Sequence, residues 1–381
     1  MRGYKHRVRL RADGRYEGRL MIDGRQVSIY GKSEREVRNN IEEIRKGVDR
    51  GEVIVKNERL ENALTDYLFQ VKQSKVKPST FDRVECTFNN QIKGSPLGRM
   101  PMGSIDGKDI QRVLDTLCDT LSWSSVKKVY DLCGEFFRYA VATRKLNHNP
   151  MVFVTMPHRS RFKKQPKPMS VFTADEVRRI IEAAESVDDK GTPRYRYGEV
   201  IVLLLLTGLR SGEVRAIRAS DIDLDAKMLY ITQNISHSKD REHGGVIDQV
   251  SSTKTKQSKR GVPLNERAVL AVERLLKQTY NPDNGYLITT QNGGFLSASY
   301  FQVQFDFILK RAGVEHKGLH TNRHSFATIL LKDAKSKGQI KEVSELLGHA
   351  QVSTTYDYYI HTFNEEKRTL VKSLDTLVKM E

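Results

Sequence analysis

The sequence predicts a multidomain α+β protein: an N-terminal three-stranded sheet with one helix, an all-α domain, and a mostly α domain that contains a small β-sheet. Three observations carry this prediction: paired Asp-Gly turns near the N-terminus, a middle region without strand signals, and short strand-like segments among helices in the C-terminal half. With 381 residues, of which 38% are hydrophobic, the chain is long enough for two or three domains with ordinary cores.

The N-terminal domain is predicted from its turns and from one helix start. Asp-Gly supplies the positive φ angles of a type I′ hairpin turn, and Asp13-Gly14 and Asp23-Gly24 each lie between alternating segments. These segments are therefore predicted as a three-stranded antiparallel meander. Ser33 and Glu36 form a capping box that starts a helix after the third strand, so residues 1–56 are predicted as one domain.

The charge of the chain favours a polyanionic partner. It has 64 Lys and Arg residues against 47 Asp and Glu, a net charge of +17, and each contact with a phosphate releases condensed counterions. A ribosomal or membrane-surface protein would show the same balance. One face of the predicted first strand carries Arg7, Arg9 and Arg11, which suits either a DNA groove or a solvated edge.

The middle of the chain is predicted to be helical. Over residues 57–156, apolar residues such as Leu60, Leu64 and Leu68 recur at helical spacing, which predicts four or five helices in one domain. Residues 157–170 follow, with prolines, a run of basic residues and no acidic residue. This composition is typical of an interdomain linker, which either tracks a DNA backbone or is simply solvated.

Residues 171–381 form the largest predicted domain. Thr173 and Glu176 make a second capping box, and the apolar segment that ends at Gly208 predicts a buried helix. Two segments, MLYITQNI and TKTKQSKRGVPL, are strand-like, and a polar stretch of about seventeen residues separates them. Everything after Val269 is predicted to be mostly helical.

Several classes of site and location are not indicated. Cys86, Cys118 and Cys133 lie far apart without the spacing of a zinc site or a disulfide framework, which fits a reducing cytoplasm. The N-terminus has no apolar segment like that of a signal peptide, and the longest apolar run is too short to span a bilayer. A soluble cytoplasmic protein without a membrane partner is expected.

Two clusters of basic residues suit the binding of an anion. Arg210 lies between the helix stop at Gly208 and a new helix that is predicted to be capped by Ser211, where backbone N–H groups favour a negative charge. Lys254 and Lys256 lie on the segment that is predicted to form a hairpin. A surface arginine and a solvated hairpin lysine are the ordinary explanations of these features taken alone.

Two further clusters lie in the C-terminal helices. His320 and Arg323 are three residues apart, so they share a helix face and can reach one phosphate, whereas His324 is expected to point elsewhere as a core or capping residue. His349 follows the helix stop at Gly348. The segment YDYYIH then contributes tyrosines that are either core aromatics or include a nucleophile: Tyr356, Tyr358 and Tyr359.

In this order and at these spacings, the four clusters resemble the tyrosine recombinase (phage integrase) family. The family pattern is an arginine in a TGLR-x-GE segment, a hairpin lysine, H-x-x-R-H, L-G-H and then Y-x-H, and every element is present. The helical region resembles the family's core-binding (SAM-like) domain, and residues 1–56 resemble the arm-type DNA-binding domains of phage and conjugative-transposon integrases. The resemblance implies the tyrosine recombinase fold.

The resemblance also implies a role for each matching residue. Arg210 and Arg323 would clamp the scissile phosphate and stabilise its transition state, and His349 would hydrogen-bond a phosphate oxygen. Tyr359 would attack phosphorus to give a 3′-phosphotyrosyl link, with His320 assisting proton transfer. Because the bond energy is kept in this link, no cofactor and no metal is expected.

The register of the motifs decides between neighbouring candidates. The family places its lysine eight or nine residues before the hairpin proline, which favours Lys254 over Lys256 as the general acid that protonates the departing 5′ oxygen. The family's nucleophile stands nine or ten residues after the histidine of L-G-H, which admits Tyr358 and Tyr359 and excludes Tyr356. The Y-x-H ending favours Tyr359.

Supporting positions bear on the alternatives. Glu213, in the same helix turn as Arg210, is expected to orient the site, and Thr321-Asn322 stands where the family usually has Asp-Leu. A type IB topoisomerase would use similar groups without forming a tetramer. A non-catalytic DNA-binding regulator would lack at least one phosphate-binding group, and none of these groups is missing from the pattern.

The resemblance predicts a site-specific DNA recombinase that integrates and excises a mobile element, a prophage or a conjugative transposon, through a Holliday junction. Its partner would be double-stranded DNA with core and arm sites. A homotetramer on DNA is expected, and a monomer in solution, an excisionase and a DNA-bending host factor are left open. An amphipathic tail favours subunit contacts over packing on its own domain: Leu370, Val371, Leu374, Leu377 and Val378.

Overall fold

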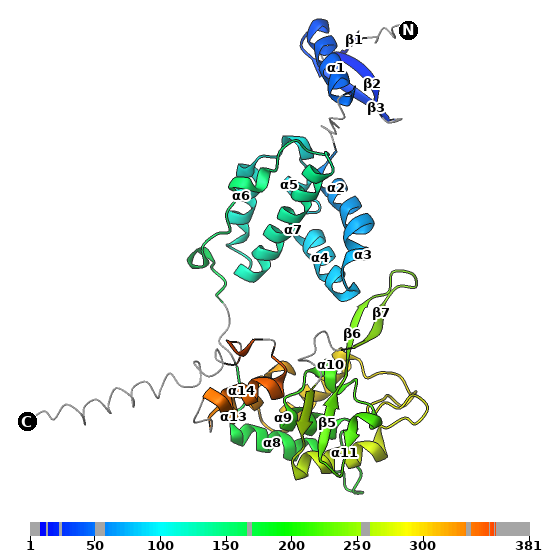
Figure 1. The fold of residues 1–381 in the computed structure, drawn as a ribbon, viewed down its shortest axis with the longest axis vertical. Helices are drawn as coiled ribbons and strands as arrows, with labels where there is room; N and C mark the ends of the chain where they lie inside the picture. The colour runs from blue at the N-terminus through cyan, green and yellow to red at the C-terminus, as the bar shows by residue number, and fades with distance from the viewer. Residues whose placement is uncertain are drawn as a thin grey trace, which may run out of the picture. The chain divides into compact units, whose positions relative to one another are not determined.

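The computed structural model describes residues 8–12, 14–22, 25–49, 58–165, 170–252, 260–332, 337–349, 351–353 and 355. It divides into two compact units, Met1–Lys167 and Pro168–Glu381. The first unit contains a small sheet with one helix, followed by a group of helices (Figure 1). The second unit is mostly helical and contains two small sheets. This is the multidomain α+β architecture that the sequence predicts.

The N-terminal sheet is an antiparallel meander, as the Asp-Gly turns predict. Its strands are β1 (Arg9–Leu10), β2 (Tyr16–Ile22) and β3 (Arg25–Gly31), and helix α1 (Glu34–Asp49) packs on one face. Four buried apolar residues fill the space between sheet and helix: Leu20, Ile29, Val37 and Ile41. The helix begins where the capping box predicts, because the Ser33 hydroxyl accepts a hydrogen bond of 3.2 Å from the Glu36 N–H.

Residues 58–165 form a helical core. Its elements are α2 (Leu60–Tyr67), the π-helical segment η1 (Leu68–Lys72), α3 (Gln73–Lys75), α4 (Pro78–Gln91), α5 (Pro96–Arg99), η2 (Met102–Ser104), α6 (Gly107–Leu117), α7 (Trp123–Ala142), η3 (Pro150–Phe153) and η4 (Arg159–Arg161). The apolar positions that predict these helices are the ones that the core buries, and Phe136 and Phe137 of α7 are fully enclosed.

The basic segment after these helices begins on the helical core. Phe162 is buried in that core, and the Arg161 guanidinium pairs with the Asp115 carboxylate at 2.9 Å. The Arg159 guanidinium lies 4.5 Å from the centre of the Trp123 ring, within range of a cation–π interaction. The first half of the predicted linker therefore packs against the helical core.

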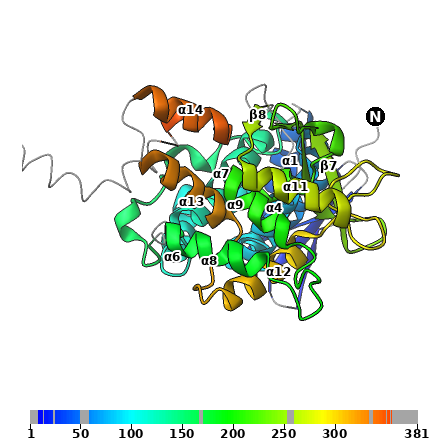
Figure 2. The same ribbon diagram turned by 90° about the horizontal axis from the view of Figure 1, so that it is seen from below.

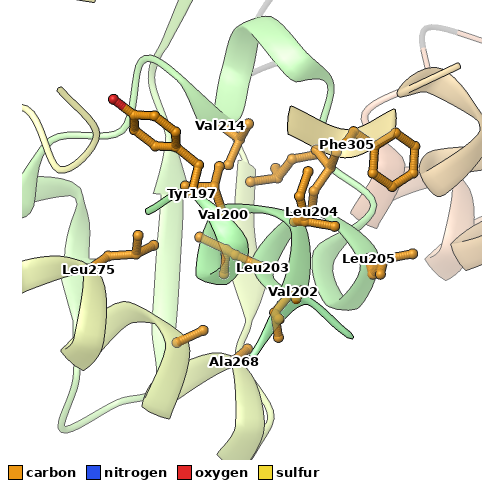
Figure 3. Packing of buried hydrophobic residues seen from close by; sticks show 14 of the residues in the cluster. Tyr197, Val200, Val202, Leu203, Leu204, Leu205, Val214, Ala268, Leu275 and Phe305 are labelled. Atoms are coloured by element: carbon orange, nitrogen blue, oxygen red, sulfur yellow. The ribbon is translucent and has the colours of Figure 1, made fainter. Parts of the chain in front are cut away.

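The second unit is built around helix α9 (Gly198–Thr207), which is buried along almost its whole length. Helices α8 (Ala174–Ala184), α11 (Glu266–Gln278) and α13 (His320–Lys332) pack against it (Figure 2). Figure 3 shows Leu203 and Leu204 of α9 among side chains that come from other elements, such as Leu275 and Phe305. The apolar run that predicts a buried helix is thus the centre of the core.

The remaining elements of the second unit surround this core. They are α10 (Ser211–Val214), η5 (Ala219–Asp221), β4 (Ile222–Asp223), β5 (Met228–Ile231), β6 (Gln233–Lys239), β7 (Val246–Ser252), β8 (Arg260–Pro263), α12 (Ala298–Arg311) and α14 (Lys337–Leu347). Strands β4, β5 and β8 form one antiparallel sheet, and β6 and β7 form a separate hairpin. The predicted strand MLYITQNI is therefore divided between two sheets.

The hairpin of β6 and β7 corrects the prediction for the polar stretch before the lysines. No strand is predicted for that stretch, but most of it pairs as the end of β6 with β7. The Asp240 carboxylate accepts the N–H groups of Glu242 and His243 at 3.0 Å each, and Gly244 and Gly245 adopt φ angles of +78° and +87° in the turn. Many side chains of this ribbon face solvent, so its strands lack the apolar alternation that identifies a half-buried strand.

Candidate active site

The first candidate residue, Arg210, lies where helix α9 ends and α10 begins. Gly208 terminates α9 with a φ of +62°, and a Cβ atom there would come within 2.4 Å of the Phe326 ring. Arg210 then caps α10, and its backbone N–H donates to Glu213 Oε2 at 2.9 Å. The cap is therefore Arg210 and not Ser211, which corrects the prediction by one residue because Glu213 supplies the capping carboxylate.

Glu213 organises the arginines of the site. Its carboxylate is only 4% exposed and accepts Arg210 Nη1 at 2.7 Å and Arg260 Nη2 at 3.0 Å. Burial by itself would raise the pKa of Glu213, but the hydrogen bonds and charges of Arg260 and Arg210 outweigh burial and lower this pKa to about 2. Glu213 is therefore ionised and holds both guanidinium groups.

Arg260 is a member of this cluster that sequence reasoning missed. It begins strand β8, is buried against Glu213, and donates from Nε to the Leu346 carbonyl at 2.6 Å. It also packs against the turn at Gly348, where a Cβ atom would lie 3.0 Å from its Nη1. No periodic pattern marks Arg260, because its partners lie far away in the sequence.

Arg323 is held even more tightly than Arg210. Its side chain is 2% exposed, and its guanidinium donates to the Gly208 carbonyl at 2.9 Å and to the Leu347 carbonyl at 2.5 Å. Arg323 thus joins the end of α9 to the end of α14. Arg210 Nη2 reaches the neighbouring Gly348 carbonyl at 3.5 Å, so the structure brings both predicted arginines to one region.

The histidines of the site are kept neutral. Burial lowers the pKa of His349 to about 4, and the positive charges of Arg323, Arg210 and Arg260 act in the same direction. Burial, followed by the charges of Arg323 and Arg210, also lowers the pKa of His320. Neutral imidazoles can accept a proton or donate one hydrogen bond each, so both residues suit proton transfer and hydrogen bonding near neutral pH.

His324 does not point away from His320. The centres of the two rings lie 4.5 Å apart in an edge-to-face arrangement, which is the contact that residues four apart make on one helix. The expectation that His324 points elsewhere is therefore wrong. Burial, followed by the charges of His320 and Arg323, lowers the pKa of His324 to about 4.

The residues that replace the family's usual Asp-Leu support helix α13. Thr321 and Asn322 are both buried, and the Asn322 side-chain amide donates to the Leu319 carbonyl at 3.1 Å. The Thr321 carbonyl accepts the hydroxyl of Ser325 at 2.8 Å. These contacts fix the start of the helix that presents His320 and Arg323.

The lysine and tyrosine candidates lie outside the described residues: Lys254, Lys256, Tyr356, Tyr358 and Tyr359. The described chain lies on both sides of the lysine segment and directly before the tyrosine segment. Strands β7 and β8 flank the lysine segment, and β8 begins at Arg260 in the site. The hydroxyl of Thr355, four residues before Tyr359 in the sequence, lies 2.8 Å from His349 Nδ1.

Two further properties concern the described residues alone. None of their groups of His, Cys, Asp and Glu side chains is arranged to hold a metal ion. Within the same ranges, every helix is too short or too polar to cross a membrane. The charge at the site is dominated by arginine, with Glu213 as the acid that contacts Arg210 and Arg260.

Comparison with known proteins agrees with this geometry. Residues 170–366 match the phage integrase family, and residues 61–154 match the phage integrase central domain. The tyrosine recombinase XerC-like protein of Caldanaerobacter subterraneus subsp. tengcongensis is 30% identical over 385 residues, which cover 96% of this chain and 94% of that protein.

Solved structures show the same fold. The Tn1549 transposon integrase in complex with a circular intermediate DNA has a TM-score of 0.66 at 18% identity, covering 83% of this chain and 99% of that chain. A lambda integrase tetramer bound to a Holliday junction has a TM-score of 0.55 at 18% identity, covering 92% and 94%. The tyrosine recombinase fold that the sequence predicts is confirmed.

Fold and family matches together define an enzyme that breaks and rejoins DNA strands. The chain belongs to the phage integrase family of tyrosine recombinases and is a site-specific DNA recombinase. The alternatives of a type IB topoisomerase and a non-catalytic regulator are not favoured by these matches.

Proposed function

We propose that this recombinase cleaves DNA with an active site of six residues: Arg210, Lys254, His320, Arg323, His349 and Tyr359. The observation that carries the proposal is the convergence of two arginines on the junction between the ends of α9 and α14. Their guanidinium groups are held by backbone carbonyls and by Glu213, that is, by contacts within the protein itself. Donors that are ordered beforehand stabilise a developing charge without a further cost in reorganisation.

The proposed cleavage step is a transfer of the phosphoryl group to a phenol oxygen. The oxygen of Tyr359 attacks phosphorus, and the bond between phosphorus and the 5′ oxygen breaks. The phenol proton passes toward the neutral imidazole of His320, and Lys254 donates a proton to the leaving 5′ oxygen. The products are a 3′-phosphotyrosyl link and a free 5′ hydroxyl group, and attack by a 5′ hydroxyl of another strand reverses these steps to rejoin the DNA.

The phosphate oxygens that gain charge in this step would be bound by Arg210, Arg323 and His349. A guanidinium is always charged and presents several N–H donors, which suits two oxygens of one phosphate. When the Thr355 hydroxyl donates to His349 Nδ1, the ring proton lies on Nε2, and this tautomer suits donation to a phosphate oxygen. The low pKa of His349 supports this neutral form.

The test is covalent capture on a suicide substrate. The full-length protein is incubated with a nicked duplex that carries its attachment site, and the expected product is a covalent protein–DNA band whose phosphate maps to Tyr359 by peptide sequencing. Tyr359→Phe should lose the band, and the matched variant Tyr358→Phe should keep it. A wild-type protein that gives no band on its correct site would refute the proposed chemistry, and a band that persists in Tyr359→Phe would place the nucleophile elsewhere.

The biological role that we propose is the integration and excision of a mobile element in the cytoplasm. Residues 1–56 would bind arm sites, residues 57–156 would bind the core site, and residues 171–381 would carry out cleavage. The lambda integrase relative is a tetramer on a Holliday junction, which supports a homotetramer on DNA for this chain. An excisionase or a DNA-bending host factor would be an accessory partner.

A further inference from the structure

The face of the N-terminal sheet opposite helix α1 carries a cluster of arginines around one acid. The register pairs Arg9 with Glu17 and Glu17 with Tyr30 across the strands, so these three side chains share a face. Arg19, two residues after Glu17 on the same strand, lies on that face as well. The arginine face predicted from the first strand therefore continues over the second strand, with a glutamate at its centre.

Glu17 is enclosed by the side chains around it. It is only 2% exposed, and its Oε2 atom accepts both Nε and Nη2 of Arg9 at 3.0 and 2.7 Å. Its Oε1 atom accepts Arg19 Nε at 3.2 Å and the Ser28 hydroxyl at 3.1 Å. Arg11 Nη1 approaches Oε2 at 3.5 Å. These hydrogen bonds, with that of Arg9 the largest cause, lower the pKa of Glu17 to about 2, so the acid is ionised.

The arginines themselves remain accessible to a ligand. The side chains of Arg9 and Arg19 are 59% and 47% exposed. A guanidinium has five N–H donors, of which Arg9 gives two and Arg19 gives one to Glu17. Both arginines therefore keep N–H donors for phosphate while their hydrogen bonds to Glu17 hold them in position.

An acid at the centre of such a face has opposing effects on DNA binding. Its charge repels phosphate, so an acid without another role would weaken binding. However, an arginine loses much side-chain freedom when it is ordered on a ligand, and an acid that orders it in the free protein removes part of that cost. The hydrogen bonds that Glu17 accepts from three separate arginines favour the second effect.

We propose that Glu17 is a positioning residue that holds Arg9 and Arg19 in one array for binding the phosphates of duplex DNA. This proposal rests on the proposed function of residues 1–56 as a DNA-binding domain, and it adds a specific role for an acid within the basic face. In contrast to a simple neutralising ion pair, a positioning role requires that loss of the carboxylate weakens specific binding although the positive charge of the protein increases.

The experiment uses the full-length protein and short duplexes selected by it from a random pool. The double variant Arg9→Ala/Arg19→Ala sorts the selected duplexes into an arm class, which it no longer binds well, and a core class, which it still binds. Glu17→Gln is then compared with wild type on both classes and on unselected duplexes. The matched control is Glu34→Gln, which removes the same charge from a glutamate that pairs with Arg38 on α1, away from the open face.

Glu17→Gln should bind the arm class about tenfold more weakly. Its affinity for the core class should be unchanged, and its affinity for unselected duplexes should be equal to or slightly above that of wild type because one negative charge is lost. Glu34→Gln should leave the ratio of arm-class to unselected binding unchanged. If the double variant weakens arm-class binding but Glu17→Gln does not, the positioning role is overturned while the DNA-binding role stands.

Two further outcomes are decisive. If the double variant loses none of the selected duplexes, the DNA-binding role of this face fails, and the positioning role fails with it. Hydrogen exchange of the β2 and β3 amides shows whether Glu17→Gln still folds. If Glu17→Gln does not fold, Ser28→Ala takes its place, because it removes one hydrogen bond to the same carboxylate without a change in charge. A lower ratio of arm-class to unselected binding in Ser28→Ala supports the positioning role, and an unchanged ratio overturns it.

Discussion

Among the described residues, each unit of the chain has a glutamate that is enclosed by arginines, Glu17 in the first and Glu213 in the second, and the two arrangements differ in how far the arginines are enclosed. Glu213 holds Arg260, which is itself buried, and Arg210, which keeps 38% of its side chain exposed. Glu17 is equally enclosed, but its partners Arg9 and Arg19 are about half exposed. The same pair of residue types therefore forms a closed network in the second unit and an open one in the first.

This difference matches what each site would have to do. A chemical step needs donors that stay in place while charge develops on a phosphate, and the buried pair of Glu213 and Arg260 provides such rigidity beside Arg210. Binding to a duplex needs many phosphate contacts at once, and accessible arginines can adapt to them while remaining ordered. The closed network suits catalysis, and the open network suits recognition of the DNA backbone.

The largest expected effect is that of Arg323→Lys. A lysine keeps the charge but cannot bridge the Gly208 and Leu347 carbonyls and a phosphate together. We expect the rate of strand cleavage to fall by about a hundredfold or more, with little change in DNA affinity. Single-turnover cleavage of the suicide substrate measures the rate. Arg19→Lys in the open network is the comparison: on a substrate that carries only the core site it should cleave at the wild-type rate, so equal losses in both variants would contradict the difference between the two networks.

The next effect concerns stability. Arg260→Met removes one partner of the buried Glu213 and leaves the carboxylate with Arg210. Breaking a buried ion pair in this way should reduce the free energy of unfolding of the second unit by about 3 kcal/mol. Arg9→Met in the open network should cost clearly less, because Arg9 is itself largely exposed and Glu17 keeps Arg19 and the Ser28 hydroxyl as partners. Denaturant unfolding, followed separately in the two units by hydrogen exchange, measures both losses of free energy. Equal losses in Arg260→Met and Arg9→Met would contradict the difference between the closed and open networks.

The smallest expected effect is the pH dependence of stability in the second unit. The folded state lowers the pKa of His349 and of His324 to about 4, whereas an unfolded chain binds these protons below about pH 6.5. The unfolded state thus gains protons first. Each shift taken alone corresponds to about 2 kcal/mol between about pH 7 and pH 5, and solvent screening of the two half-buried rings should reduce the combined fall in the free energy of unfolding to about 2 kcal/mol.

Unfolding curves at several pH values check this prediction. His349→Gln should flatten the dependence, and His148→Gln, at an exposed position of the first unit, should not. Glu213, with a pKa of about 2, should add a further loss in the same direction only as the pH falls below about 4.5. The free energy of unfolding should change between the histidine pKa of the unfolded chain and the lowered pKa of the folded state. If it did not, burial would not be keeping the imidazoles neutral.

The sequence by itself determined the local features of the protein. The Asp-Gly dipeptides predict the meander that the three strands form, the Thr173 and Glu176 capping box is formed in full, and Gly208 ends the central helix in the left-handed conformation. These features depend on residues within one turn or hairpin, so their physical causes are visible in a short segment. The spacing of the motifs likewise pointed to Arg210, His320, Arg323 and His349, which the structure brings close enough for the two arginines to lower the pKa of both histidines.

Only the tertiary structure decided which long-range partners complete these sites. Arg260 meets Glu213 and Leu346 across 47 and 86 residues, and no periodic pattern records such contacts. The β6 and β7 hairpin was missed because many of its side chains face solvent, so apolar alternation does not mark its strands. Glu17 became an enclosed ionised acid only through the register of three strands, since burial and charge are properties of the assembled sheet and not of a single residue.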